Sequence, residues 1–169
     1  MRSLPIISLI LSCLWLSACA TPVPVLPPAE SIKGDTALLV VLIHGLEEDE
    51  GQINMTCRTE SADWPTGIDA EYVRVAPVAG HSGMMEIRID DVPTGIYAIS
   101  LFHDVDADND MDRSALGFPL EPWGMSNNAI GLMSAPTFEQ AAFIVNAPKT
   151  IVEIDLRRGI TLQPRSPVL

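Results

Sequence analysis

Short segments in which apolar and polar residues alternate recur along this chain from Thr36 onward. A period of two puts every second side chain on the same face, which is the pattern of a half-buried β-strand. No segment carries the period of a long helix. About seven strands separated by turn residues are typical of two packed antiparallel sheets. The expected strands are residues 36–44, 52–58, 71–78, 84–92, 96–103, 142–145 and 150–157.

The predicted domain is one all-β, immunoglobulin-like antiparallel sandwich over residues 36–158. The strand at 96–103 is apolar on both faces, which indicates a central position. Tyr97 follows a Pro-Thr-Gly turn, so it is either a corner tyrosine that hydrogen-bonds back across the turn or an ordinary packed residue. Cys57 lies on the apolar face of its strand, which favours a core residue over a reactive thiol.

The first 18 residues have the features of a secretory signal peptide. Arg2 supplies a positive charge, and the apolar run at residues 4–16 is too short to span a bilayer. The sequence LSAC at residues 16–19 resembles a bacterial lipobox; an ordinary signal peptide with an incidental cysteine is the alternative. We expect a lipid on Cys19 to anchor the chain in a membrane. Because Ala20 follows in place of an aspartate, the expected location is the periplasmic face of the outer membrane, or the cell surface.

Residues 19–35 are rich in proline, which favours an extended tether, and residues 159–169 are expected to be a flexible tail. Once the leader is removed, only Cys57 and the lipidated cysteine remain, so no intramolecular disulfide is expected. The formal net charge of −12 repels nucleic acid and attracts cations. No nucleic-acid partner is therefore expected.

The densest chemistry lies in residues 101–128. Acidic oxygens at alternate positions are what a calcium loop needs, because this hard cation takes six to eight oxygen ligands. Asn109 stands at the sixth position, where the loop requires a left-handed conformation. Calcium is therefore the expected cofactor. The candidate ligands are Asp104, Asp106, Asp108, Asp110 and Asp112.

This loop departs from an EF-hand in two ways. The twelfth position holds Ala115 where a bidentate glutamate is usual, and the loop follows a strand and not a helix. Glu121 or Glu139 is a candidate for the missing ligand, and the expected affinity is in the extracellular range of roughly 10⁻⁴ to 10⁻³ M. The alternative is a solvated acidic loop whose side chains only satisfy the local backbone.

Residues 115–133 show no strand or helix period, and so long a segment inside a compact domain usually has a function. Residues 137–140 (TFEQ) resemble a capping box, which predicts one short helical turn. The candidate binding residues of this region are His103, Trp123, Ser126, Asn127 and Asn128.

No catalytic motif stands out. The chain has no G-x-S-x-G, phosphate-binding loop or C-x-x-C, and its three histidines, at 44, 81 and 103, lack metal-ligand spacing. We therefore expect a non-enzymatic binding or structural role. The alternative is a small metal-dependent or hydrolytic enzyme that uses His103, Asp104 and residues 126–128. It requires His103, Asp104 and Asn127 to converge in one concave pocket.

The chain resembles a bacterial family called domain of unknown function 2141 over roughly residues 36–157. The resemblance rests on Gly95-Ile96-Tyr97-Ala98, Phe102-His103-Asp104, Leu116-Gly117-Phe118-Pro119, Trp123-Gly124-Met125-Ser126-Asn127-Asn128 and Pro136-Thr137-Phe138. The acidic loop has Asp-Asn-Asp where the family has Asn-Gly units. The resemblance implies a transthyretin-like or carboxypeptidase-regulatory-like sandwich in an envelope protein, and it implies no reaction. An envelope protein or a glycan is the expected partner, and an accessory role in surface export is a further possibility.

Overall fold

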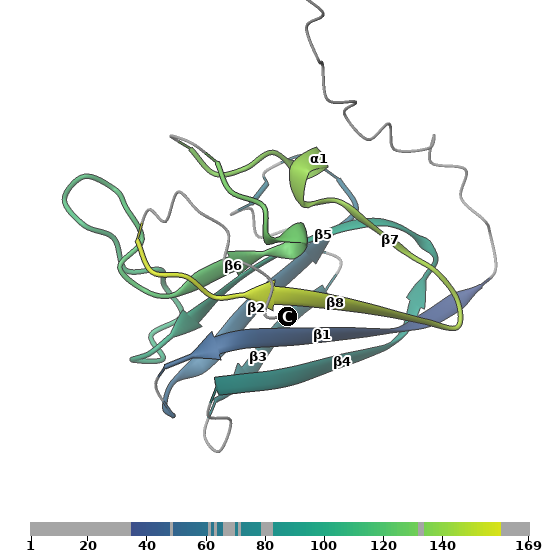
Figure 1. The fold of residues 1–169 in the computed structure, drawn as a ribbon, viewed down its shortest axis with the longest axis horizontal. Coiled ribbons are helices and arrows are strands. Elements are labelled where there is room, and N and C mark those ends of the chain that lie inside the picture. Colours follow the sequence, from purple (N-terminus) through teal and green to yellow (C-terminus); the bar gives the residue numbers. More distant parts are fainter. Residues whose placement is uncertain are drawn as a thin grey trace, which may run out of the picture.

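Two β-sheets packed face to face form the protein, with one short helix beside them (Figure 1). The computed structural model describes residues 35–47, 49–60, 62, 64–65, 70, 72–78, 83–131 and 134–159. The first sheet has the order β4–β1–β8; the second has β3–β2–β5–β6, with β7 also pairing with β5. The predicted all-β sandwich is confirmed. The elements are β1 (Thr36–Leu46), β2 (Gln52–Arg58), β3 (Tyr72–Pro77), β4 (Gly83–Pro93), β5 (Gly95–Asp104), β6 (Trp123–Met125), η1 (Ser126–Asn128), α1 (Phe138–Ala141), β7 (Phe143–Val145) and β8 (Lys149–Asp155).

Several sequence expectations concern residues outside this described part. They are the signal peptide, the lipid on Cys19, the tether up to residue 34, His81 and the tail from residue 160. Within the described ranges, no helix combines the length and apolar composition that crossing a membrane requires.

The core lies between the inward faces of the two sheets. Leu39 and Ile43 of β1 and Ile53 of β2 are 0% exposed and belong to one continuous apolar cluster. Cys57 belongs to the same cluster and is also fully buried, which confirms its prediction as a core residue. The alternation of the sequence therefore becomes the inside and outside of each sheet.

One strand pair departs from the predicted antiparallel arrangement. β8 runs parallel to β1, with Val152 opposite Val41, whereas β1–β4 and the pairs of the second sheet are antiparallel. β7 and β8 are consecutive but lie in different sheets, so they form no hairpin. Because the chain crosses between the sheets at residues 146–148, the direction of β8 follows from that crossing and not from a tight turn within one sheet.

Tyr97 is both a packed core residue and a tyrosine that hydrogen-bonds back across the turn, the two roles that the sequence offered as alternatives. Its side chain is buried in the core cluster at 4% exposure, and its hydroxyl donates a hydrogen bond to the carbonyl of Pro93 over 3.0 Å. The tyrosine therefore both fills the core and closes the turn between β4 and β5.

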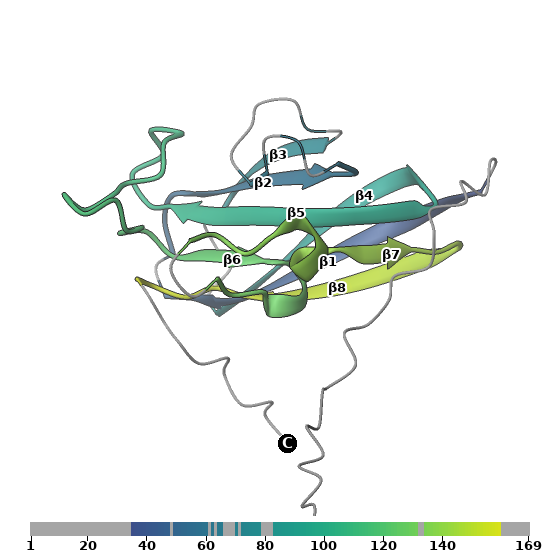
Figure 2. The same cartoon turned by 90° about the horizontal axis from the view of Figure 1, so that it is seen from above.

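A long loop between β5 and β6 projects beyond one end of the sandwich (Figure 2). It contains the acidic segment. β5 is paired on one edge with β2 and on the other with β6 and β7, so the strand that leads into the loop is held from both sides. The loop thus starts from an interior strand of the second sheet.

Candidate functional site: an acidic loop at the end of β5

The pairing of β2 with β5 brings two polar side chains to the end of the second sheet. In this antiparallel register Gln52 lies opposite Asp104, and Ile53 lies opposite His103. Because side chains alternate between faces, His103 shares the core side with Ile53, while Asp104 shares the outer side with Gln52. His103 and Asp104 are each 0% exposed. Adjacent in sequence, the two side chains therefore point apart, as the strand pattern predicts.

Asp104 accepts hydrogen bonds from two directions. Gln52 Nε2 and Asn54 Nδ2, both on β2, donate to its Oδ2 over 2.8 Å each. The backbone N–H of Asn109 also donates to Oδ2, over 2.9 Å, and that of Asp108 donates to Oδ1 over 3.1 Å. The loop is therefore wound around this one carboxylate, and Oδ1 is its less occupied oxygen.

These hydrogen bonds decide the charge of Asp104. Burial on its own raises the pKa of a carboxyl group, but the donors from Gln52, Asn109, Asp108 and Asn54 outweigh it, so the pKa lies below its ordinary value of 3.8. Asp104 is consequently ionised at neutral pH although no solvent reaches it. It is a fixed negative charge at the base of the loop.

Three of the five predicted ligands meet. One carboxylate oxygen from each of Asp104, Asp106 and Asp108 lies within 4.8 Å of the other two. Asp110 and Asp112 do not belong to this group. Oδ1 of Asp110 instead accepts the N–H of Met111 over 2.9 Å. Asp104, Asp106 and Asp108 are therefore close enough to share one ion, and metal binding by any of the five aspartates stays a prediction.

The backbone supports the tight winding of the loop. Asn109 has a φ of 68°, which confirms the left-handed conformation predicted for the sixth position. Ala107 has a φ of 60°, a conformation that L-residues other than asparagine and glycine rarely adopt. The N–H of Asp110 donates to Oδ1 of Asp108 over 2.8 Å. These features wind the backbone tightly between Ala107 and Asp110.

Glu121 closes the loop from outside the aspartate series. Its Oε1 accepts the N–H of Val105 over 2.9 Å, and its Oε2 accepts the N–H of Asp112 over 3.2 Å, so it joins both ends of the loop. Burial raises the pKa of Glu121, which is 6% exposed, against the effect of these two hydrogen bonds. Of the two glutamates predicted as an added ligand, Glu121 thus reaches the loop, whereas Glu139 lies in the first turn of α1.

The pKa of Asp106 responds to the surroundings of this carboxyl group in the acidic loop. Partial desolvation and the charges of Asp108 and Asp112 raise its pKa above 3.8. A bound cation would relieve this repulsion. For the same reason, protons compete with a cation more strongly here than at an isolated carboxylate.

His103 fastens the neighbouring loop from inside the core. Its Nε2 lies 2.8 Å from the carbonyl oxygen of Glu50, and because a carbonyl only accepts, Nε2 carries the hydrogen. Its buried Nδ1 has no hydrogen-bond partner in the described residues. His103 therefore ties the end of β5 to the connection between β1 and β2.

The Ser-Asn-Asn element joins separate parts of the sandwich. Ser126 is fully buried, and its Oγ accepts the N–H of Ile99 over 2.9 Å and donates to the carbonyl of Ala141 over 2.6 Å. Asn127 Nδ2 donates to the carbonyl of Ala142 over 2.7 Å. This part of η1 therefore ties β5 to α1 and to the start of β7.

Asn128 makes the link to the first sheet. Its Oδ1 accepts the N–H of Asp155 over 2.8 Å, and its Nδ2 donates to Oδ2 of Asp155 over 3.1 Å. Trp123 adds a second link, because its backbone pairs with Arg157 and its indole Nε1 donates to the carbonyl of Gly159 over 3.2 Å. The polar groups predicted to bind a partner are thus engaged in holding the two sheets together. A contact of theirs with a ligand stays a prediction.

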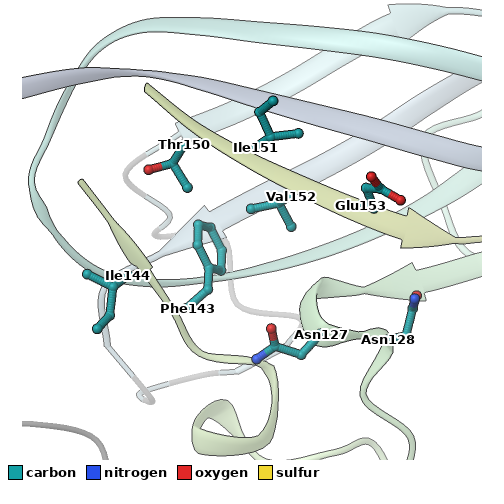
Figure 3. Close-up of a pocket in the computed structure, with 8 residues that line it drawn as sticks. All are labelled: Asn127, Asn128, Phe143, Ile144, Thr150, Ile151, Val152 and Glu153. Atoms are coloured by element: carbon teal, nitrogen blue, oxygen red, sulfur yellow. The ribbon is translucent and has the colours of Figure 1, made fainter. Parts of the chain in front are cut away.

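A shallow groove of about 420 Å³ lies beside this element (Figure 3). Its walls are β7, β8 and η1, and Asn127 and Asn128 line one side. His103 and Asp104 are not among its lining residues. This groove therefore does not bring together His103, Asp104 and Asn127, which is the convergence that the enzymatic alternative requires.

The sequence pattern did not reveal a small hairpin at residues 113–120. Its turn is closed by the N–H of Ser114 donating to the carbonyl of Phe118 over 2.9 Å. The hairpin exposes apolar side chains beside the acidic loop: Leu116 is 82% exposed, Phe118 40% and Leu120 53%. Exposed apolar groups in one place often mark an interaction site. The expected envelope protein or glycan partner itself stays a prediction.

The family comparison agrees with the sequence resemblance. Residues 41–153 match the sequence model of a bacterial family described as "Uncharacterized protein conserved in bacteria (DUF2141)". No curated protein and no solved structure shows a significant match. The matched segment extends from β1 through the acidic loop and the Ser-Asn-Asn element to β8, and it covers more than half of the chain. The chain therefore belongs to the DUF2141 family.

Proposed function

We infer that this protein is a non-enzymatic, lipid-anchored module of the cell envelope that binds calcium through the loop at residues 104–112. The observation that carries the inference is the convergence of the Asp104, Asp106 and Asp108 carboxylates within 4.8 Å. Three carboxylates at this separation repel one another strongly unless a cation lies between them.

The chemistry of the loop favours calcium over softer metals. The clustered donors are carboxylate oxygens, and a hard cation prefers such ligands, whereas zinc and copper favour nitrogen and sulfur. Backbone carbonyls and water would complete the six to eight ligands that calcium takes. The Asp104 carboxylate supplies a permanent charge, since its pKa is lowered, and Glu121 holds the two ends of the loop together.

Calcium is expected to raise the melting temperature of the chain from residue 20 to 169, which retains every described residue. At about 10 mM calcium and a Kd of roughly 1 mM, linkage gives about 1.4 kcal/mol, or a shift of about 3–6 °C relative to EDTA. The measurement is thermal unfolding followed by circular dichroism. In the variant Asp106→Asn/Asp108→Asn the shift should disappear.

The matched control is Asp110→Asn. It removes one negative charge from the same loop but lies outside the carboxylate cluster, so its calcium shift should stay close to that of the parent chain. A shift that is equal in all three proteins would mean that calcium only screens the net charge, and the proposed site would be wrong.

The anchor is tested separately. Replacement of Cys19 by alanine removes the thiol that the lipobox resemblance predicts to be lipidated, so the protein should move from the membrane fraction to the soluble periplasmic fraction. Fractionation with immunodetection measures this, and Cys57→Ala is the matched control because Cys57 is buried in the core. Membrane retention of a processed Cys19→Ala protein would contradict the anchor.

A further inference from the structure

β8 is an edge strand whose outer side carries unpaired backbone groups. The N–H of Leu38 bonds to the carbonyl of Pro148, and the N–H of Leu156 bonds to the carbonyl of His44, so the even-numbered residues of β8 point their backbone groups toward β1. In a parallel pair, successive residues alternate between the two sides. The odd-numbered residues therefore point theirs away from β1, along the open edge.

This open stretch has a defined end. The N–H of Asp155, which is odd-numbered, is already bound by Asn128 Oδ1 over 2.8 Å. Among the described residues, no hydrogen-bond partner occupies the outward backbone groups of Lys149, Ile151 or Glu153. The free edge is thus five residues long, with Ile151 at its centre.

Two side chains of opposite charge flank Ile151 along this edge, Lys149 two residues before it and Glu153 two residues after it. Lys149, Ile151 and Glu153 are the exposed, odd-numbered residues at the start and centre of β8, and Ile151 is 52% exposed. Figure 3 shows Ile151 and Glu153 on this strand. No carboxylate of the described part of the chain lies within ion-pair distance of Lys149. Glu153 has one weak ionic neighbour, Nε2 of His44 at 3.7 Å.

We propose that two copies of this chain pair through antiparallel β8 strands about a two-fold axis at Ile151. In this register Ile151 meets its own copy, and Lys149 of each chain meets Glu153 of the other, so both charges find an opposite partner. All three residues point their N–H and C=O groups to the shared edge, which makes them hydrogen-bonded pairs of the new ladder. The two three-stranded sheets then form one continuous sheet of six strands.

Charge reversal tests the register directly. Sedimentation velocity of the residue 20–169 chain should show a dimer that dissociates on dilution. Lys149→Glu and Glu153→Lys each place like charges opposite one another twice per dimer, and each should weaken association roughly tenfold. The double variant Lys149→Glu/Glu153→Lys restores opposite pairs and should recover it. Glu86→Lys, on the far strand β4, is the matched control and should dimerise like the parent chain.

Cross-linking tests the two-fold axis. Hydrogen-bonded residues of an antiparallel pair have Cα atoms about 5.5 Å apart, which is within the range of a disulfide. Ile151→Cys should therefore form a disulfide-linked dimer when copper and dissolved oxygen serve as oxidant, whereas Val75→Cys, an equally exposed position on β3, should not. A monomer at every concentration, a dimer insensitive to charge reversal, or equal cross-linking of both cysteine variants would overturn the proposal.

Discussion

Replacement of Gly51 by alanine is expected to lower the free energy of unfolding by about 3 kcal/mol. Gly51 has a φ of 78°, and this conformation costs an L-residue about 1–2 kcal/mol. A Cβ atom there would also overlap the carbonyl oxygen of Asp104 and lie 2.7 Å from Cα of Val105. Both neighbours are backbone atoms at the start of the acidic loop, so relieving the overlap must move the loop, at a cost of about 1–3 kcal/mol.

The same substitution should reduce calcium binding, because the displaced loop starts at Asp104. Urea unfolding measures the stability, and the calcium-induced rise in melting temperature measures the binding. Gly83→Ala is the matched control: Gly83 has a φ of 83° but faces open space, so only the backbone cost of about 1–2 kcal/mol is expected. Equal losses in the two variants would show that the contact between Gly51 and the loop is unimportant.

The sequence predicts most strands because their signal is local. Alternation over seven residues is enough to place β2, and the capping box at residues 137–140 is confirmed by reciprocal hydrogen bonds between Thr137 and Gln140. β6 was missed because it has three residues, too few for a period, and exists only through pairing with Ser100–Phe102 of β5. The parallel direction of β8 was missed for a similar reason, since it depends on where the chain crosses between sheets.

The site follows the same division between local and distant contacts. The meeting of Asp104, Asp106 and Asp108 could be predicted because short-range bonds from the amides of the loop fold it around Asp104. The donors Gln52 and Asn54 come from a strand some 50 positions earlier in the chain. They become partners of Asp104 only through the register of β2 against β5. That register cannot be read from the local sequence pattern of either strand.

The Ser-Asn-Asn element illustrates a different limit. Polar residues in a segment without a period are compatible with ligand binding and equally with internal hydrogen bonds. Ser126, Asn127 and Asn128 use their side chains to join β5, α1 and β8. The left-handed conformations of both asparagines, with φ of 58° and 50°, also explain why this residue type occurs twice there.

Replacement of Asp104 by asparagine is expected to cost about 2–3 kcal/mol of stability at neutral pH and to abolish the calcium-induced rise in melting temperature. The carboxylate accepts four hydrogen bonds, from two side chains of β2 and two loop amides. An asparagine offers one oxygen and turns an NH₂ group toward the remaining donors, which leaves at least one of the four donors unsatisfied. Urea unfolding measures the loss. Asp110→Asn, an exposed position in the same loop, should change stability by less than about 0.5 kcal/mol.

The pH dependence of this difference identifies its cause. Because the folded pKa of Asp104 is lowered below 3.8, its carboxylate contributes stability that is fully present above that value. The contribution is lost as the pH falls through the folded pKa, since the folded protein must then take up a proton that the unfolded chain already carries. Asparagine has no such proton. The gap between the parent chain and Asp104→Asn should therefore stay constant from neutral pH down to about pH 5 and narrow below about pH 3.8. If the difference in free energy of unfolding between the parent chain and Asp104→Asn does not depend on pH, the lost stability comes from packing. The charge of Asp104 would then have no part in forming the loop.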